Sequence, residues 1–449
     1  MVVRAVPLPA DAIAIARALS SRPGLAVLAS RPVGAPRPAD ARFSFVACDP
    51  DSVSEDLLPP TESEGPARGW DGAPPAPRWM GVVPYDALRG IERPRWTRHP
   101  ETRPEPLHAR PRWQRYPAVV RIDHATGAVC VEAVDDAAAD RLLARAGSVG
   151  QAPSPFHLRV EPPDEPDEAH LERVRRALQL IAEGDLYQVN LARRIRLSIR
   201  GDLLSLFASL LDAAPAPWGF FQDLGSSVVC ASSPELALSV EGRTLRSCPI
   251  KGTRPRGHDA AEDFHNSREL DADPKERAEL VMSVDVHRND LGAVAVPGSV
   301  HVTGEPRVTA GRTVWSRVAE VVALRAPGID TRAVLRACLP AGSVTGAPKV
   351  RAMEVIASLE PWRRGAYTGV FGHAGRGGSA TLAMAIRTIE MEKGPAEHRG
   401  VYFTGGGIVA DSVPGRELEE TRWKAMQLEA LGGAGGGGAH ELEPGRSTD

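Results

Sequence analysis

Acidic side chains recur at helical spacing in two separate segments of the chain. Glu417, Glu420 and Lys424 are three and four residues apart, and Glu276 and Glu279 are one helical turn apart. Residues at these spacings lie on the same face of a helix. Carboxylate oxygens are the ligands that Mg²⁺ prefers, so either pair could contribute to a cation site. By spacing alone, a solvated charged face or an ion pair to a neighbouring arginine is the more frequent explanation.

Two glycine-rich segments could bring the backbone close to an anion. Residues 405–407 are three successive glycines after a short apolar strand, and glycine lets a backbone approach a ligand closely. Residues 342–349 form a second such loop, in which Pro348 suits the first turn of a following helix. Free amides at a helix N-terminus bind anions such as a substrate carboxylate. A purely structural turn is the alternative for this second loop.

One lysine and one arginine occupy positions suited to reaction with, or binding of, a carboxylate. Lys251 lies in a Pro- and Gly-rich turn, residues 249–257, that follows a strand. A lysine amine becomes nucleophilic when it is desolvated or lies near another cation, because its pKa then falls. Arg387 ends an apolar strand, where its guanidinium could hold a carboxylate with two hydrogen bonds. An ordinary surface lysine and a structural ion pair are the alternatives.

Regular elements that would position these side chains are predicted mainly after residue 167. Apolar residues at helical spacing predict a helix over residues 171–181 that Gly184 ends, and alternation predicts a strand over residues 187–199. Further strands are expected at residues 227–231, 236–240, 367–373, 380–388 and 400–404. Further helices are expected at residues 269–287, 330–338, 348–359 and 414–430. Because these elements alternate without a strict βαβ rhythm, we expect an α/β (α+β) fold with large antiparallel sheets.

Three other segments have their own signatures. Residues 117–134 alternate apolar and polar side chains and predict a hairpin around residues 125–127. Residues 149–166 contain five prolines and several acids, which predicts a crossover linker. Residues 432–449 are Gly-rich without apolar periodicity, so we expect a disordered tail.

The bulk composition disfavours several classes of function. The formal net charge is -3, so the chain offers no broad basic field and no nucleic-acid partner is expected. Neither a secretory signal nor a run of about eighteen apolar residues occurs, so we expect a cytoplasmic protein without a membrane span. The five cysteines include no C-x-x-C pair, which indicates reduced, buried thiols.

Eight strings in order along residues 165–430 resemble the chorismate-binding enzymes. They are residues 181–191, 233–236, 249–254, 282–292, 342–349, 364–369, 386–388 and 405–424. Residues 1–150 match more weakly and resemble the N-terminal region of the amine-forming members of that family. The resemblance implies a two-layer sandwich of large, mainly antiparallel sheets flanked by helices.

The same resemblance implies the residues of an active site. Mg²⁺ would be held by Glu279 and Glu420, with Glu417 nearby, and would bind the ring carboxylate of chorismate. Arg387 and Tyr367 would bind the enolpyruvyl carboxylate. The remaining pocket residues that it implies are Gly407, Thr345 and Lys424.

Four positions bear on the reaction that the resemblance implies. Glu235 matches the general acid that protonates the departing C4 hydroxyl, which requires a carboxyl that holds a proton near neutral pH. Gln188 stands where the water-adding branches have a lysine base, and glutamine cannot deprotonate water. Lys251 matches the lysine of the aminodeoxychorismate synthases, whose amine is thought to attack C2 and expel the C4 hydroxyl. Thr313 stands where the family usually has a histidine associated with pyruvate elimination.

These positions lead us to expect the activity of aminodeoxychorismate synthase component I, which makes 4-amino-4-deoxychorismate for p-aminobenzoate and folate. No glutaminase signature is present, so ammonia is expected from a separate glutamine amidotransferase subunit. The alternatives are anthranilate synthase component I and a 2-amino-2-deoxyisochorismate synthase. An alternative of another class is a non-catalytic, chorismate-binding regulatory subunit.

Overall fold

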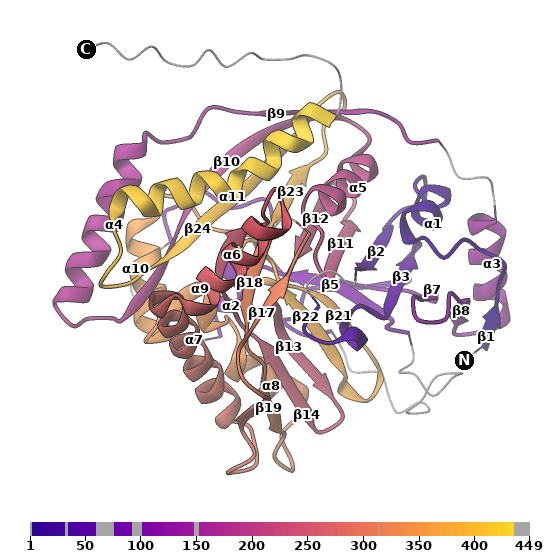
Figure 1. Cartoon of the computed structure of the whole chain (residues 1–449). Coiled ribbons are helices and arrows are strands. Elements are labelled where there is room, and N and C mark those ends of the chain that lie inside the picture. The colour runs from indigo at the N-terminus through magenta and orange to yellow at the C-terminus, as the bar shows by residue number, and fades with distance from the viewer. Residues whose placement is uncertain are drawn as a thin grey trace.

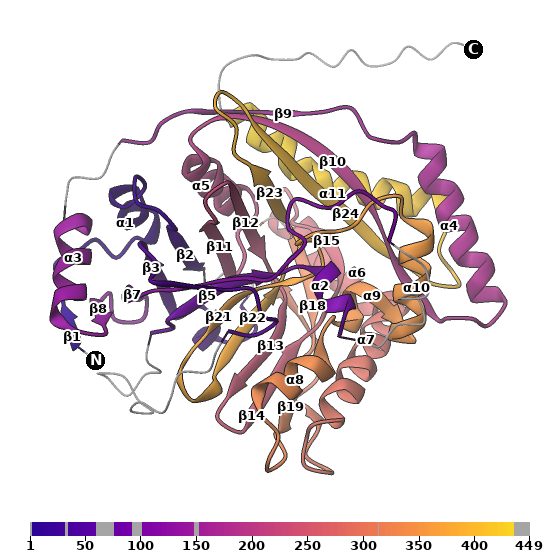
Figure 2. The same cartoon turned by 180° about the vertical axis from the view of Figure 1, so that it is seen from behind.

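Two large antiparallel sheets form the body of the protein, and helices cover their outer faces (Figures 1 and 2). The computed structural model describes residues 2–31, 35–59, 76–91, 101–147, 152–312 and 314–434. The arrangement confirms the predicted sandwich of large antiparallel sheets flanked by helices.

Over the described residues the larger sheet has 12 strands. Its order is β1 (Val2–Ala5), β8 (Val129–Ala133), β7 (Ala118–Asp123), β3 (Phe43–Ala47), β2 (Ala26–Ser30), β11 (Trp218–Asp223), β12 (Ser227–Ser233), β23 (Thr388–Glu392), β24 (His398–Ile408), β10 (Gln188–Gly201) and β20 (Gly346–Ala347). The remaining strand, β9 (Phe156–Val160), pairs with β10 beside this path.

The second sheet has nine strands among the described residues. Its order is β16 (His301–Val302), β19 (Val321–Leu324), β14 (Thr244–Cys248), β13 (Leu236–Glu241), β22 (Ala380–Met384), β21 (Val370–Ala374), β5 (Trp79–Val83), β6 (Arg112–Arg115) and β4 (Ser52–Ser54). A small third sheet contains β15 (Ile250–Pro255), β18 (Val314–Val318) and β17 (Arg307–Ala310).

The helices divide between the two outer faces. The larger sheet is covered by α1 (Ala12–Ala18), α3 (Asp136–Ala146), α5 (Leu203–Ala213) and α11 (Pro414–Ala434). The second sheet is covered by α7 (Pro274–Gly292) and α8 (Thr331–Cys338). Two helices pack beside the start of β10, namely α4 (Asp167–Ala182) and α10 (Lys349–Leu359). The others are α2 (Tyr85–Arg89), α6 (Ala260–Ala272) and the short α9 (Gly342–Thr345).

The core between the sheets joins the N-terminal strands to the later ones. Phe45 and Met80 belong to the same buried cluster as Phe220 and Phe371. The rings of Phe220 and Phe371 stack with centroids 4.8 Å apart. Burial of each such side chain contributes about 1.5–3 kcal/mol. Since β2 pairs with β11 and β5 pairs with β21, both sheets run through the N-terminal part and the rest of the chain.

Most predicted elements are confirmed, with boundaries shifted by a few residues. The helix before Gly184, the long strand β10, the hairpin of β7 and β8, and the helix α11 all form. The five cysteines are buried thiols, as expected. Within the part of the chain that the structure describes, no helix combines the length and apolar character needed to cross a membrane.

Four predicted boundaries are wrong, each for a local reason. The helix expected over residues 269–287 is two helices, because Asp273 caps the amides of Lys275 and Glu276 and Pro274 cannot continue α6. The expected linker over residues 149–166 contains β9, which pairs with β10. The strand expected over residues 380–388 breaks into β22 and β23 at Arg387, whose φ is 50°. Residues 432–434 of the expected tail belong to α11.

Candidate active site

Lys251 and Glu235 meet at one carbonyl-lined corner. Lys251 Nζ, on β15, donates a hydrogen bond of 3.1 Å to the carbonyl of Ser343. The hydroxyl of Ser343 donates to Glu235 Oε1 at 2.6 Å, and Asn190 Nδ2 donates to the Ser343 carbonyl at 3.2 Å. Residues 250–255, which were predicted to form a turn, are the strand β15, which pairs with β18. The fold therefore brings this strand, Glu235 and the 342–349 loop together.

The environment of Glu235 suits a proton donor. The side chain is 3% exposed, and this burial raises the pKa of its carboxyl to about 7. The hydrogen bond from Ser343 and the charge of Lys251 offset part of the rise. A carboxyl that is about half protonated near neutral pH can give up a proton to a leaving group.

A cluster of acids lies where α7 approaches α11. Lys275 Nζ lies 3.8 Å from Glu279 Oε1 and 3.9 Å from Glu417 Oε1, so one amine faces acids of both helices. Lys424 Nζ lies 2.6 Å from Glu420 Oε1 and donates to the carbonyl of Gly405 at 2.8 Å. The predicted residues Glu279, Glu417, Glu420 and Lys424 thus lie in one region.

For most of these acids the nearby cations offset only part of the effect of burial, and at Glu276 the cation is Arg254, 3.4 Å away. Burial raises the pKa of Glu279 to about 7 and also raises the pKa values of Glu276 and Glu417. Burial acts in the same direction on Glu420, but Lys424 outweighs it and lowers the pKa of that carboxyl. Buried carboxylates of this kind require a cation as partner.

The donor chemistry of this cluster fits a magnesium ion. All four acids offer carboxylate oxygens, which a small hard cation prefers. In the described ranges, no three His, Cys, Asp or Glu side chains already converge closely enough to hold a metal. The amine of Lys275, whose side chain is 46% exposed, stands between two of the acids and has room to turn toward solvent when a cation binds.

Tyr367 lies beside the glycine-rich end of β24, and Arg387 is close enough to Tyr402 in the same strand for their charges to interact. Within the described residues the guanidinium of Arg387 has no hydrogen-bond or ion-pair partner, and burial lowers its pKa. A partly buried guanidinium without a protein partner among the described residues is suited to bind an anion. Tyr367 stacks on Phe403 with ring centroids 5.2 Å apart. A Cβ atom at Gly405 would lie 2.9 Å from the Tyr367 hydroxyl, so the absence of a side chain at Gly405 leaves room for this hydroxyl.

Gly407 lies beside Gln188 and Lys251, whereas Thr345 is buried within its own loop. A Cβ atom at Gly407 would lie 2.5 Å from Gln188 Nε2 and 3.7 Å from Lys251 Nζ. Gln188 is buried, and its Nε2 has no hydrogen-bond partner in the part of the chain that the structure describes. Thr345 is fully buried, and its hydroxyl donates to the Ala341 carbonyl at 2.9 Å, inside its own loop. Thr313 lies outside the described residues.

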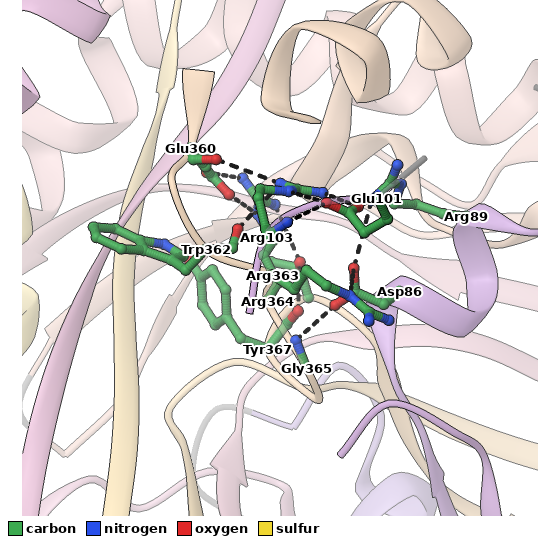
Figure 3. A network of polar contacts seen from close by, with 11 residues as sticks. Asp86, Arg89, Glu101, Arg103, Glu360, Trp362, Arg363, Arg364, Gly365 and Tyr367 are labelled. Carbon is green, nitrogen blue, oxygen red and sulfur yellow. Dashed lines mark hydrogen bonds and ion pairs between the residues drawn. The ribbon is translucent and has the colours of Figure 1, made fainter. Parts of the chain in front are cut away.

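The sequence patterns did not single out the buried pair of Arg364 and Glu360, which joins three site segments (Figure 3). Arg364, 1% exposed, donates to both carboxylate oxygens of Glu360, at 2.8 and 2.6 Å. It also donates to the carbonyls of Val344 in α9 and Asn190 in β10, at 3.2 and 2.7 Å. Arg364 lies inside a string that carries the family resemblance, but the resemblance assigned it no role.

Comparison with known proteins agrees with this geometry. The family model described as chorismate binding enzyme matches residues 49–430. The anthranilate synthase component 1 of Streptomyces coelicolor is 44% identical over 258 residues, which are 57% of this chain and 50% of that protein. The protein of that name from Thermococcus kodakarensis is 40% identical over 313 residues, 69% of this chain and 71% of its own. The match thus spans about half the length of the Streptomyces relative.

Solved structures show the same fold. Anthranilate synthase component I from Streptococcus pneumoniae superposes with a TM-score of 0.72 at 27% identity, over 86% of this chain and 92% of that one. The menaquinone-specific isochorismate synthase of Escherichia coli superposes with a TM-score of 0.73 at 19% identity, over 96% and 95%. The match of the family model over most of the chain identifies this protein as a member of the chorismate-binding enzyme family.

Proposed function

We propose that the protein aminates chorismate to 4-amino-4-deoxychorismate, the activity of aminodeoxychorismate synthase component I. The observation that carries the proposal is the amine of Lys251, which reaches the Ser343 carbonyl beside the Glu235 carboxyl. A nucleophilic lysine and a proton donor in one corner suit a substitution in which a hydroxyl leaves.

The two residues have complementary tasks in this reaction. Once the ammonium of Lys251 has lost a proton to solvent, its amine forms a bond to ring C2, the ring double bonds shift, and the C4 hydroxyl leaves as water with the proton of Glu235. A proton of the new C2 ammonium then returns to Glu235. Ammonia attacks C4, the double bonds shift back, and the bond from C2 to the lysine breaks as Glu235 protonates the departing amine. The new C4 ammonium then returns a proton to Glu235. The covalent step therefore directs the new amine to C4.

The remaining residues bind and orient the substrate. Glu279 and Glu420, with Glu417 nearby, would hold Mg²⁺, which supplies positive charge to the ring carboxylate when bound. Arg387 and Tyr367 hold the enolpyruvyl carboxylate, while Gly407 and Thr345 shape the wall and Lys424 keeps Glu420 ionised. Gln188 cannot remove a proton from water, which disfavours hydration of the ring.

Anthranilate formation is the second candidate, and the names of the relatives favour it. Proteins called anthranilate synthase component 1 match at 44% and 40% identity. Lys251 and the missing histidine at Thr313 favour the first candidate. For either amine product we propose that a separate glutamine amidotransferase supplies ammonia, because no glutaminase signature is present in the chain.

Product analysis separates these candidates. The protein is incubated with chorismate, Mg²⁺ and ammonium, with and without aminodeoxychorismate lyase, and the products are identified by mass spectrometry. We expect p-aminobenzoate only when the lyase is added. Anthranilate in the absence of lyase would overturn the proposal in favour of the second candidate. No turnover by the folded protein would instead support a regulatory chorismate-binding subunit.

A further inference from the structure

The turn that carries Tyr367 has an unusual backbone. Gly365 has a φ of 62°, and Thr368 has a φ of 59°. The left-handed region disfavours a β-branched residue such as threonine, at a cost of about 1–3 kcal/mol. Residues 364–368, which we call the Tyr367 turn, therefore keep this shape only because their surroundings hold it.

Two carboxylates hold consecutive amides of this turn. The amide of Gly365 donates to Asp86 Oδ2 at 2.9 Å, and the amide of Ala366 donates to Glu390 Oε1 at 2.9 Å. Each carboxylate side chain is 2% exposed. Figure 3 shows Asp86 directed at Gly365, with Arg363 and Arg89 beside it. Hydrogen bonds from buried amides to carboxylates are strong, because water cannot replace them.

Both hydrogen bonds to the turn depend on residues in the N-terminal part of the chain. Asp86 belongs to α2, 279 residues before Gly365. The other carboxylate oxygen of Glu390, Oε2, lies 2.9 Å from His108 Nδ1, and His108 Nε2 lies 3.0 Å from the Ser227 hydroxyl. A Cβ atom at Gly365 would lie 2.8 Å from both carboxylate oxygens of Glu390. There is thus no room for a larger residue at position 365 between the turn and Glu390, and His108 fixes the Glu390 carboxylate from its other side.

We propose that Asp86 and Glu390 are positioning residues that hold the Tyr367 turn, so that the Tyr367 hydroxyl faces the bound substrate carboxylate. This inference rests on the proposed role of Tyr367 in substrate binding. The two acids touch neither substrate nor reacting atoms; they act through the backbone of the turn. When one of these two hydrogen bonds is lost, the strained turn relaxes, and the Tyr367 hydroxyl moves away from its position beside Gly405.

The experiment is a double-mutant cycle that follows the disappearance of chorismate. Asp86→Ala should raise KM for chorismate about 10- to 100-fold, the worth of one hydrogen bond to a charged group, with kcat within a few-fold. Asp86→Asn should restore most of the affinity, because its amide oxygen still accepts from Gly365. Tyr367→Phe should raise KM similarly, and the double variant with Asp86→Ala should be no worse than Tyr367→Phe alone.

Asp123→Ala is a matched control far from the site. The Asp123 side chain is 4% exposed, pairs with Arg42 and accepts from the Ala125 amide at 3.0 Å. Its loss should lower the melting temperature as Asp86→Ala does, but leave KM unchanged. If Asp86→Ala does not fold, the Gly365→Ala variant is used in its place. The added Cβ atom lies too close to the Glu390 carboxylate, so it disturbs the same turn.

The outcomes separate this inference from the proposed function. An unchanged KM in Asp86→Ala or Gly365→Ala, or KM increases that multiply with Tyr367→Phe, would overturn the positioning role. Neither result depends on which product forms. Anthranilate as product would reject the proposed function and leave the positioning of Tyr367 intact.

Discussion

The two walls of the site are built in opposite ways. One wall, which we call the turn wall, comprises β10, α9 and the Tyr367 turn, and Arg364 is fully paired inside it. The other, the acid wall, comprises the acids of α7 and α11, with Lys275 and Lys424 half exposed among them. The turn wall has its buried charges paired within the protein, whereas the acid wall keeps buried acids beside half-exposed lysines.

This difference follows from how each wall satisfies its charges. Arg364 and Glu360 share hydrogen bonds with carbonyls and amides, among them the amide of Ala192, which donates to Glu360 at 2.9 Å. Burial raises the pKa values of Glu279 and Glu417, and the nearby lysines offset only part of this rise. Substitutions should therefore act mainly on stability in the turn wall and mainly on cation binding in the acid wall.

The largest effect is expected from Arg364→Ala, which leaves Glu360 buried and unpaired. Removing one partner of a buried ion pair costs about 3–5 kcal/mol of unfolding free energy. Denaturant unfolding measures this loss, and chorismate turnover should disappear with it. A loss below about 1 kcal/mol, typical of an exposed pair, would show that the turn wall is no more rigid than the acid wall.

Glu235→Gln tests the charge state at the corner of the turn wall. The folded protein raises the pKa of this carboxyl to about 7, so folding favours its protonated form. The stability that this preference contributes is present at low pH and is lost as pH rises from about 4.5 through about 7. Between pH 4 and 8 the wild type should lose about 3 kcal/mol relative to Glu235→Gln. A pH-independent difference in unfolding free energy would contradict the assignment.

Magnesium should stabilise the acid wall. With Mg²⁺ at about 10 to 100 times its dissociation constant, the wild type should gain about 1–3 kcal/mol of unfolding free energy. The gain should vanish when Glu279 and Glu420 are both replaced by Gln. An equal gain in that variant would place the cation elsewhere.

The smallest effect is expected from Lys275→Ala. Its two contacts are longer than hydrogen bonds and its side chain is 46% exposed, so stability should change by less than about 1 kcal/mol. Mg²⁺ should bind somewhat more tightly, since the lysine no longer competes for the acids. Weaker binding in a calorimetric titration would mean that Lys275 supports the cation site.

The sequence predicted those parts of the site that local patterns define. Periodicity located β10 and α11, and the Asp273-Pro274 pair contained the signal for the helix break that was missed. The alternation of residues 156–160 likewise indicated a strand within the proline-rich linker. By contrast, the left-handed conformations of Thr368 and Arg387 have no sequence signature, because neither residue is glycine.

Long-range contacts are the part that the sequence could not reveal. The hydrogen bond between Gly365 and Asp86 joins residues that are 279 positions apart in the sequence. The contact between His108 and Glu390 joins residues that are 282 positions apart. Such pairings depend on how the N-terminal strands enter both sheets. No local pattern encodes them.

The most direct test of the account is intact-protein mass spectrometry of the enzyme quenched with acid during reaction with chorismate and Mg²⁺, without ammonia. The account predicts a mass increase of one chorismate less one water, mapped to the peptide that contains Lys251 and absent from Lys251→Ala. Two results would contradict it. One is a wild type that forms 4-amino-4-deoxychorismate but shows no adduct at any quench time. The other is a Lys251→Ala variant that forms this product as fast as the wild type.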